Sequence, residues 1–240
     1  MKRSGLALVT LLAAGLWSTQ AVAFDARAHL QPRTDRYTVQ WGGISLGEGT
    51  IALIEEGEGC YRFESTTDPI AIVRWTYGAP RERSRFCVRD GRILPQTFEY
   101  VNDKRHKDAF RLDFDWNKGE VRTLRRGEIS VRELPEDGAY DRFVIREVVR
   151  LWVLRHAAGE AEAEASFTMV DDDRIKTYRF AIGERETIDT PSGRIEALRV
   201  DRIDERRPHR YWLDPQRGYL PVRIEQMKDG KAELRMLRVE

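Results

Sequence analysis

Hydrophobic side chains recur at every second position along much of this 240-residue chain. In one stretch Phe110, Leu112 and Phe114 alternate with charged residues, and further along Tyr178 and Phe180 do the same. A period of two is typical of a β-strand that buries one face and exposes the other to water. The pattern therefore predicts an all-β fold.

Short turn signals separate these alternating stretches. Gly42-Gly43, Asp90-Gly91, Arg126-Gly127 and Asp229-Gly230 are pairs of this kind, and each stands between two alternating runs. Turns of this length join antiparallel neighbours and are too short for a crossover helix. We expect about ten strands, each paired mainly with its sequence neighbours, in a strongly curved antiparallel sheet or half-barrel meander.

Two segments depart from the alternation. Asp68 to Trp75 is short and apolar, and predicts one or two helical turns. Asp141 to His156 predicts the main helix, because its apolar residues recur at i, i+3, i+4 and i+7. Asp141 is a suitable cap, and Gly159 lies just past the end. Four arginines occupy the other directions of this helix: Arg142, Arg146, Arg150 and Arg155. We expect the helix to cover one opening or one face of the sheet.

The first 23 residues have the pattern of a cleavable signal peptide. Lys2 and Arg3 form a positive start, an apolar run extends from Leu6 to Trp17, and Ala21-Val22-Ala23 offers small residues at a cleavage site. The alternative is a membrane anchor, but a spanning helix needs about 20 apolar residues and this run is nearer a dozen. We expect residues 24–240 to form a single β-rich domain in the periplasm, not membrane-spanning after cleavage.

The charges are dense but balanced in sign. The chain has 41 Lys and Arg against 40 Asp and Glu. Removal of residues 1–23 takes away Lys2 and Arg3, which leaves 39 against 40. A nucleic-acid-binding protein usually gathers a basic excess on one face. The composition thus predicts solvated polar faces and no nucleic-acid partner.

The chain has two cysteines, Cys60 and Cys87. Each would stand on the polar face of its strand, Cys60 with Arg62 and Cys87 with Arg85. An exported protein meets oxidising conditions in which a disulfide persists. We expect the two to be joined, and the alternative is two unpaired thiols on unrelated strands.

Catalytic and metal-binding patterns are weak. The sequence has no Gly-x-Ser-x-Gly elbow and no Gly-rich phosphate loop that opens a helix. His106 and Asp108 offer the best metal pair, but exposed residues on a wet strand face are the favoured explanation. Asp171 to Asp173 lacks the spacing of a calcium loop. We expect no enzymatic activity, no cofactor and no metal, although a catalytic site formed only in three dimensions stays open as an alternative.

Four aromatic residues on inner strand positions are the candidate ligand-binding residues: Phe110, Phe114, Tyr178 and Phe180. They are either core residues or the lining of a pocket, because a curved sheet fills its concave side or leaves room for an apolar guest. The pocket interpretation predicts a non-enzymatic binding or carrier module for an apolar or lipid-like ligand. The alternative function is a structural or assembly factor that engages another envelope protein through a sheet edge or the helix face.

Several strand-and-turn motifs resemble one family. These are the strand pair from Tyr37 to Gly47, and the segments Arg81–Phe86, Asp90–Pro95, Phe98–Tyr100, Arg210–Pro215 and Tyr219–Ile224. As a set they resemble the exported bacterial proteins that share the domain of unknown function 3108. The resemblance runs from about Tyr37 to the end of the chain, and implies a β-rich periplasmic protein with no known activity or catalytic residue. In shape alone, a curved sheet with a helical plug is also similar to the periplasmic lipoprotein carriers.

Cleavage after Ala23 makes a direct prediction. The protein recovered from a periplasmic fraction should begin at Phe24, and intact mass spectrometry should show loss of the first 23 residues. Recovery of the full-length chain in the membrane fraction would contradict the signal-peptide interpretation.

Overall fold

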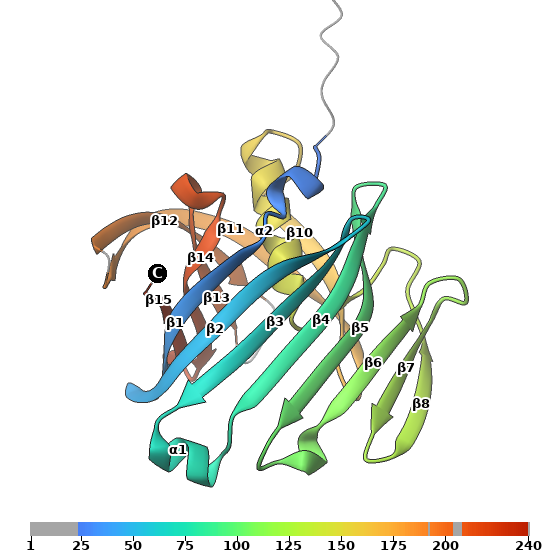
Figure 1. Ribbon diagram of the computed structural model, residues 1–240. Coiled ribbons are helices and arrows are strands. Elements are labelled where there is room, and N and C mark those ends of the chain that lie inside the picture. Colours follow the sequence, from blue (N-terminus) through green and yellow to red (C-terminus); the bar gives the residue numbers. More distant parts are fainter. Residues whose placement is uncertain (1–23, 192, 204–207, 240) are drawn as a thin grey trace, which may run out of the picture.

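The computed structural model describes residues 24–191, 193–203 and 208–239, and these form one highly curved sheet (Figure 1). Fifteen strands make up the sheet in this part of the chain: β1 (Arg33–Trp41), β2 (Ile44–Gly57), β3 (Cys60–Pro69), β4 (Pro80–Arg89), β5 (Arg92–Asn102), β6 (Phe110–Asp115), β7 (Glu120–Arg125), β8 (Glu128–Glu133), β9 (Tyr140–Asp141), β10 (Glu164–Val170), β11 (Ile175–Thr190), β12 (Gly193–Arg202), β13 (His209–Asp214), β14 (Leu220–Lys228) and β15 (Lys231–Arg238). The helices are α1 (Ala71–Thr76) and α2 (Ile145–Ala157), with short 3-10 turns η1 (Arg27–His29), η2 (His106–Asp108) and η3 (Pro215–Arg217).

The order of strands confirms the predicted antiparallel meander. Along the sheet the strands follow β8 back to β1, then β15 back to β9, so nearly every strand lies beside its sequence neighbour. The non-local pair is β1 with β15, which joins the two ends of the chain. The expected number of about ten strands is too low. β8 alternates Ile129 and Val131 with polar residues but is exposed at nearly every position, and β9 has two residues, too few to show a period.

The turn residues act as predicted. At the β4–β5 hairpin, Asp90 and Gly91 have φ values of 51° and 71°. Positive φ at both central positions defines the type I′ turn, whose twist matches that of the flanking strands.

The predicted disulfide is confirmed. Cys60 of β3 faces Cys87 of β4 in direct register, and their Cα atoms are 3.9 Å apart. The bond therefore links two neighbouring strands across the connection that contains α1.

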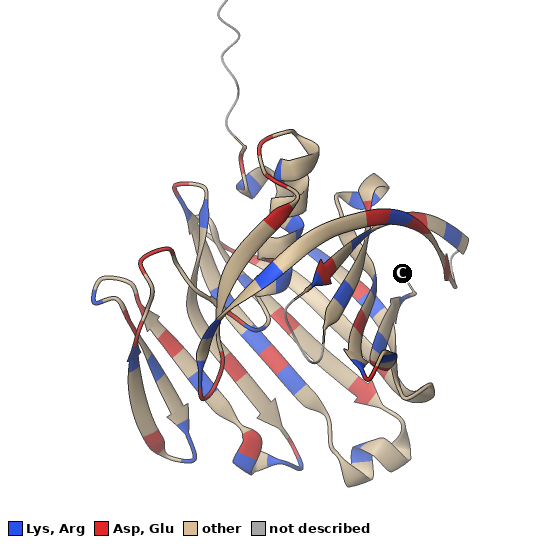
Figure 2. Ribbon diagram, turned by 180° about the vertical axis from the view of Figure 1, so that it is seen from behind, with Lys and Arg blue, Asp and Glu red and all other residues tan. Residues whose placement is uncertain are grey.

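The outer faces of the strands carry charges of both signs. Figure 2 shows Lys and Arg interspersed with Asp and Glu along the ribbons, without a large region of one sign. Many of these residues are paired across strands, as Arg111 is with Glu99 at 2.6 Å. Such exposed pairs stabilise little individually, and they agree with the prediction of solvated polar faces.

Helix α2 lies inside the concave side of the sheet, with strands β10 to β12 curving behind it (Figure 1). One side of the helix, with Val148 and Leu151, packs into a core cluster that contains Phe110. Its other side, with Val149 and Trp152, packs into a second cluster. The helix is therefore a component of the core with two covered sides, and the prediction that it covers one opening or one face is too simple.

A buried ion pair holds α2 in place. Glu147 and Arg150 are almost completely buried, with 2% and 3% exposure, and Arg150 Nε lies 3.0 Å from Glu147 Oε2. Arg33 of β1 pairs with the same carboxylate. Arg150 also donates to the carbonyl oxygens of His29 at 2.7 Å and Gly218 at 2.9 Å. Burial alone would raise the pKa of Glu147, but the two guanidinium groups lower it below its ordinary value.

Replacement of Glu147 tests this network. The change Glu147→Gln should lower the free energy of unfolding by about 3–5 kcal/mol, because it leaves the buried charge of Arg150 without a carboxylate partner and Arg33 with Asp35 alone. Urea unfolding monitored by circular dichroism measures the loss. The matched control is Asp189→Asn, which breaks an exposed pair with Arg194 and should leave stability unchanged. Equal effects of the two variants would contradict the assigned role.

Helix α2 begins at Ile145, and its N-cap residue Val144 forms no side-chain capping bond, so the prediction that Asp141 caps the helix itself is wrong. Asp141 instead orders the turn that precedes the helix. Its Oδ1 accepts hydrogen bonds from the backbone N–H groups of Phe143 at 2.9 Å and Val144 at 2.8 Å, while Ser84 donates to Oδ2. These bonds form a turn that leads into α2 at Ile145. Burial raises the pKa of Asp141 from 3.8 to about 6, against the hydrogen bonds that lower it.

This raised pKa predicts a pH dependence of stability. Because the folded-state pKa lies above the unfolded value, protonation of Asp141 stabilises the fold fully below about pH 3.8, and the contribution is lost as pH rises through about 6. Asparagine can keep the turn but cannot titrate. The stability of the parent relative to Asp141→Asn should therefore fall by up to about 3 kcal/mol between pH 4 and pH 7. Urea unfolding across this range measures it, and parallel pH profiles for the two proteins would contradict the prediction.

Candidate functional site

The concave side of the sheet is filled only in part. Beyond the first turn of α2 lies an open cavity of about 860 Å³, which we call the concave groove. Its walls come from the inner faces of strands β1 to β6, from β14 and β15, and from the α1 connection. Val73 of α1 and Arg146 of α2 both line it, and Figure 1 shows where these two helices lie. The groove results from the shape of the sheet, because α2 fills one half of the concavity and the short α1 does not fill the other.

Apolar side chains form much of the groove wall. Val39 of β1, Ile51 of β2 and Met236 of β15 contribute neighbouring positions on the inner face. Tyr100 of β5 and Phe110 of β6 contribute aromatic rings from another part of the sheet. A cavity lined in this way favours an apolar guest.

The mouth of the groove has an exposed apolar rim. Trp41 from the β1–β2 hairpin and Tyr77 from the α1 connection line the groove while remaining 46% and 42% exposed. Ile44, Ile72 and Trp75 belong to the same two segments and are 70%, 61% and 75% exposed. The two segments are joined by a 2.9 Å hydrogen bond from the N–H of Ile70 to the carbonyl oxygen of Leu46. Grouped exposure of large apolar residues is typical of an interaction surface.

Most charged residues of the groove wall are neutralised by a partner. Glu48 pairs with Arg36 at 3.8 Å and Asp108 with Arg105 at 4.0 Å. Arg125 pairs with Asp172 at 2.7 Å. These pairs leave little free charge on this part of the wall.

Arg142 is fixed by two carboxylates and by aromatic rings. It lies 2.9 Å from Glu82 and 3.4 Å from Asp171, and its guanidinium stacks over several aromatic rings, among them Tyr100 at 4.7 Å and Phe110 at 5.1 Å. The two carboxylates raise its pKa further although burial opposes this. Arg142 is therefore a structural part of the groove wall.

Arg146 differs from the other charged residues of the wall. Among the residues that the structure describes, its guanidinium forms no ion pair or hydrogen bond, and it lies over the ring of Phe143 at 5.0 Å. Arg146 is half-buried on the first turn of α2. It gives the groove a positive charge that the protein itself leaves uncompensated.

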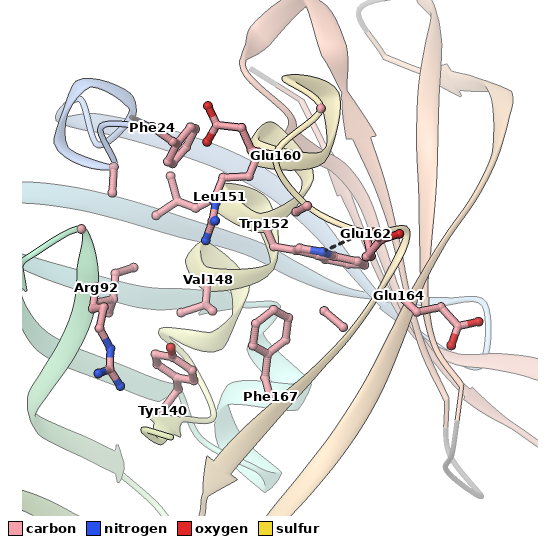
Figure 3. Close-up of a pocket in the computed structure, with 17 residues that line it drawn as sticks. Phe24, Arg92, Tyr140, Val148, Leu151, Trp152, Glu160, Glu162, Glu164 and Phe167 are labelled. Carbon is pink, nitrogen blue, oxygen red and sulfur yellow. Dashed lines mark hydrogen bonds between the residues drawn. The ribbon is translucent and has the colours of Figure 1, made fainter. Parts of the chain in front are cut away.

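A second cavity of about 680 Å³, which we call the seam pocket, lies between α2, β10 and the β4–β5 turn. Figure 3 shows Tyr140, Val148 and Phe167 directed toward this space, with Arg92 on the opposite wall. The ring of Phe167 meets those of Tyr140 and Trp152 edge-on, with centroids 6.2 Å and 5.9 Å apart. Trp152 donates its indole N–H to the carbonyl oxygen of Glu162 at 3.0 Å (Figure 3). These contacts join α2 to β10 and to the segment before β10 along one wall of the seam pocket.

The four aromatic residues predicted to bind a ligand do not form one site. All are buried, but Phe110 and Phe114 belong to the cluster on one side of α2, while Tyr178 and Phe180 belong to the cluster on the other. Of the four, Phe110 lines the concave groove, and none lines the seam pocket. Ligand binding by this set stays a prediction, and the structure gives Phe114, Tyr178 and Phe180 the surroundings of core residues.

Sequence reasoning missed Arg146. Arg142, Arg146 and Arg150 recur at intervals of four, which predicts one shared helix side, but α2 begins at Ile145 and Arg142 precedes it. The expectation that the arginines simply occupy directions away from the core is wrong for Arg150, which is buried. Nothing in the sequence distinguishes Arg146 from these other arginines, because its lack of an ion partner among the described residues depends on the residues that surround it in the fold.

The candidate metal residues lie in other settings than expected. His106 and Asp108 form part of η2 and are not on a strand face. Asp171 and Asp172 pair with Arg142 and Arg125. Across residues 24–239, outside the gaps noted above, no group of three His, Cys, Asp or Glu residues is arranged to hold a metal ion.

The signal-peptide prediction concerns residues 1–23, which lie outside the described residues. In the part of the chain that is described, no helix combines the length and apolar character required to cross a membrane.

Comparison with known proteins agrees with the family resemblance. A search of curated proteins finds no match to the chain. The family model described as "Protein of unknown function (DUF3108)" matches residues 36–236, which includes nearly the whole sheet from β1 to β15. The chain therefore belongs to the DUF3108 family.

Proposed function

We propose that this protein is a non-enzymatic carrier that binds an apolar or lipid-like ligand in the periplasm. The observation that carries the proposal is the concave groove, an open cavity of about 860 Å³ with an apolar wall on an otherwise well-packed sheet. Pockets for small ligands in proteins commonly have about 300–1,000 Å³. Burial of an alkyl chain in the groove would contribute about 0.8 kcal/mol for each methylene group.

The rim at the groove mouth supports a carrier function. Ile44, Ile72 and Trp75 expose apolar surface on the two segments that contribute Trp41 and Tyr77 to the groove. A chain that passes between a membrane or another protein and the groove would cross this rim without full exposure to water. Tryptophan suits such a position because its ring has an apolar body and one polar N–H group.

The periplasmic location is part of the proposal. It is supported by the signal-peptide pattern of residues 1–23 and by the disulfide between Cys60 and Cys87, which is typical of proteins in oxidising compartments.

A filling substitution tests the groove as the binding site. Ser65 lies on β3 and lines the groove, so Ser65→Trp should occupy the space of the ligand. We expect saturable binding of a fluorescent fatty-acid probe to the delipidated parent protein, and at least a tenfold loss in Ser65→Trp, because an acyl chain depends on several buried methylene groups. Probe fluorescence titration measures the affinity.

The control is the same substitution outside the groove. Ser166 lies exposed on β10 and lines neither cavity, so Ser166→Trp should bind the probe as the parent does. Thermal unfolding of both variants verifies that they are folded. The carrier proposal fails if the folded, delipidated parent shows no saturable binding, or if Ser65→Trp binds the probe as well as Ser166→Trp does.

One observation favours the alternative of an assembly factor. Strand β8 is an edge of the sheet, and its Ile129 and Val131 are 59% and 52% exposed. An open edge can pair with an extended segment of another protein. A helix-face contact has less support, because both apolar sides of α2 are buried in the core. Failure of the probe to bind would favour the edge-pairing function.

A further inference from the structure

We infer that the groove selects an amphiphile with an anionic head group, and that Arg146 binds this head group at the inner end while the apolar tail extends toward the rim. The inference rests on the proposed carrier function and names its ligand class. The head-group chemistry is a carboxylate or a phosphate monoester, since either offers oxygen atoms that accept the parallel N–H groups of a guanidinium.

Nearly all the charged residues of the groove wall are paired with an opposite charge. Seven charged residues line the groove: Glu48, Glu82, Asp108, Arg125, Arg142, Arg146 and Asp172. Six of them lie within 4.0 Å of an oppositely charged partner. Arg146 is the exception among the described residues. A ligand anion can therefore pair with Arg146 without displacing an existing ion pair.

Within the described part of the chain, the surroundings of Arg146 provide no hydrogen-bond acceptor for its guanidinium group. The guanidinium carries five N–H donors and lies over the ring of Phe143, which offers no hydrogen-bond acceptor beyond its π face. The residue is half-buried, so part of its hydration is lost on folding. A carboxylate or phosphate in the groove would supply the acceptors that the protein does not. The acid groups of the wall are already engaged by Arg36, Arg105, Arg125 and Arg142.

The start of α2 does not provide an alternative anion site. The backbone N–H groups of Phe143 and Val144 are already bonded to the carboxylate of Asp141. The same carboxylate offsets the positive end of the helix dipole. The attraction for an anion thus comes from the Arg146 side chain.

The positions of the charged and apolar residues set the orientation of the ligand. Arg146 lies on α2, at the inner side of the groove, and Trp41 and Tyr77 lie at the exposed rim. Ile51 and Met236 contribute apolar wall to the same cavity. A head group at Arg146 therefore leaves the tail on the apolar part of the wall.

Three probes with the same sixteen-carbon chain test the inference: hexadecanoic acid, hexadecyl phosphate and hexadecanol. Each competes with an uncharged fluorescent alkyl probe for the delipidated protein. The parent should bind the acid or the phosphate about 10- to 100-fold more tightly than the alcohol, the range for hydrogen bonds to charged groups. Arg146→Gln should remove this preference and leave the affinity for hexadecanol within about twofold. Arg146→Lys should retain part of it, because the charge remains.

The matched control is Arg155→Gln on the same helix. Arg155 lines the seam pocket and not the concave groove, so this variant should keep the full preference for the anionic probes. Comparable affinity of the parent for the acid, the phosphate and the alcohol overturns the inference while the carrier function stands. A preference that persists in folded Arg146→Gln overturns it as well. If none of the three probes binds the parent, the carrier function and the inference fail together.

Discussion

The buried charges of α2 determine where the helix lies, and the rest of the concave side depends on that position. Glu147 can avoid an uncompensated charge only where it meets both Arg33 and Arg150, and Arg150 in turn contacts two backbone carbonyl oxygens. Buried ion pairs contribute little net stability, because desolvation offsets much of the attraction. Their effect here is on position, since a shift of the helix by one turn would separate Glu147 from Arg33 and Arg150 from the carbonyl oxygens of His29 and Gly218. α2 is thereby fixed in one half of the curved sheet, and the other half becomes the concave groove.

Local features of the fold were predictable from the sequence because they depend on neighbouring residues. The alternation of Phe110, Leu112 and Phe114 follows from the pleat of a single strand, and all three are buried on β6 as predicted. The Asp90-Gly91 turn follows from the backbone freedom of these two residue types. The disulfide was predictable for a similar reason. Cys60 and Cys87 lie on consecutive strands, where an antiparallel register brings them opposite each other.

Features that depend on distant residues were not predictable in this way. The pairing of β1 with β15 joins segments almost 200 positions apart, and alternation carries no information about such partners. The same limit applies to the candidate ligand set. Alternation shows that Tyr178 and Phe180 point inward, but not that α2 fills the space in front of them. The unpaired charge of Arg146 was missed because it depends on the lack of a nearby carboxylate in the described structure. That lack is known only when every neighbouring strand is in place.

The open groove and the exposed rim both follow from the short length of α1. Helix α1 has six residues and contributes Val73 to the groove wall, while Ile72 and Trp75 on the same short helix face solvent. A longer helix at this position could have filled the concavity and buried these residues, which would have stabilised the fold through added apolar burial. The protein lacks that stabilisation and has an exposed apolar surface, which carries a risk of aggregation. An open groove with an exposed apolar rim is unfavourable for a sheet that has only a structural role. It is favourable for a sheet that must admit an apolar chain from its end. The uncompensated charge of Arg146 in the same cavity fits this interpretation, because a filled core would have required it to be paired or replaced.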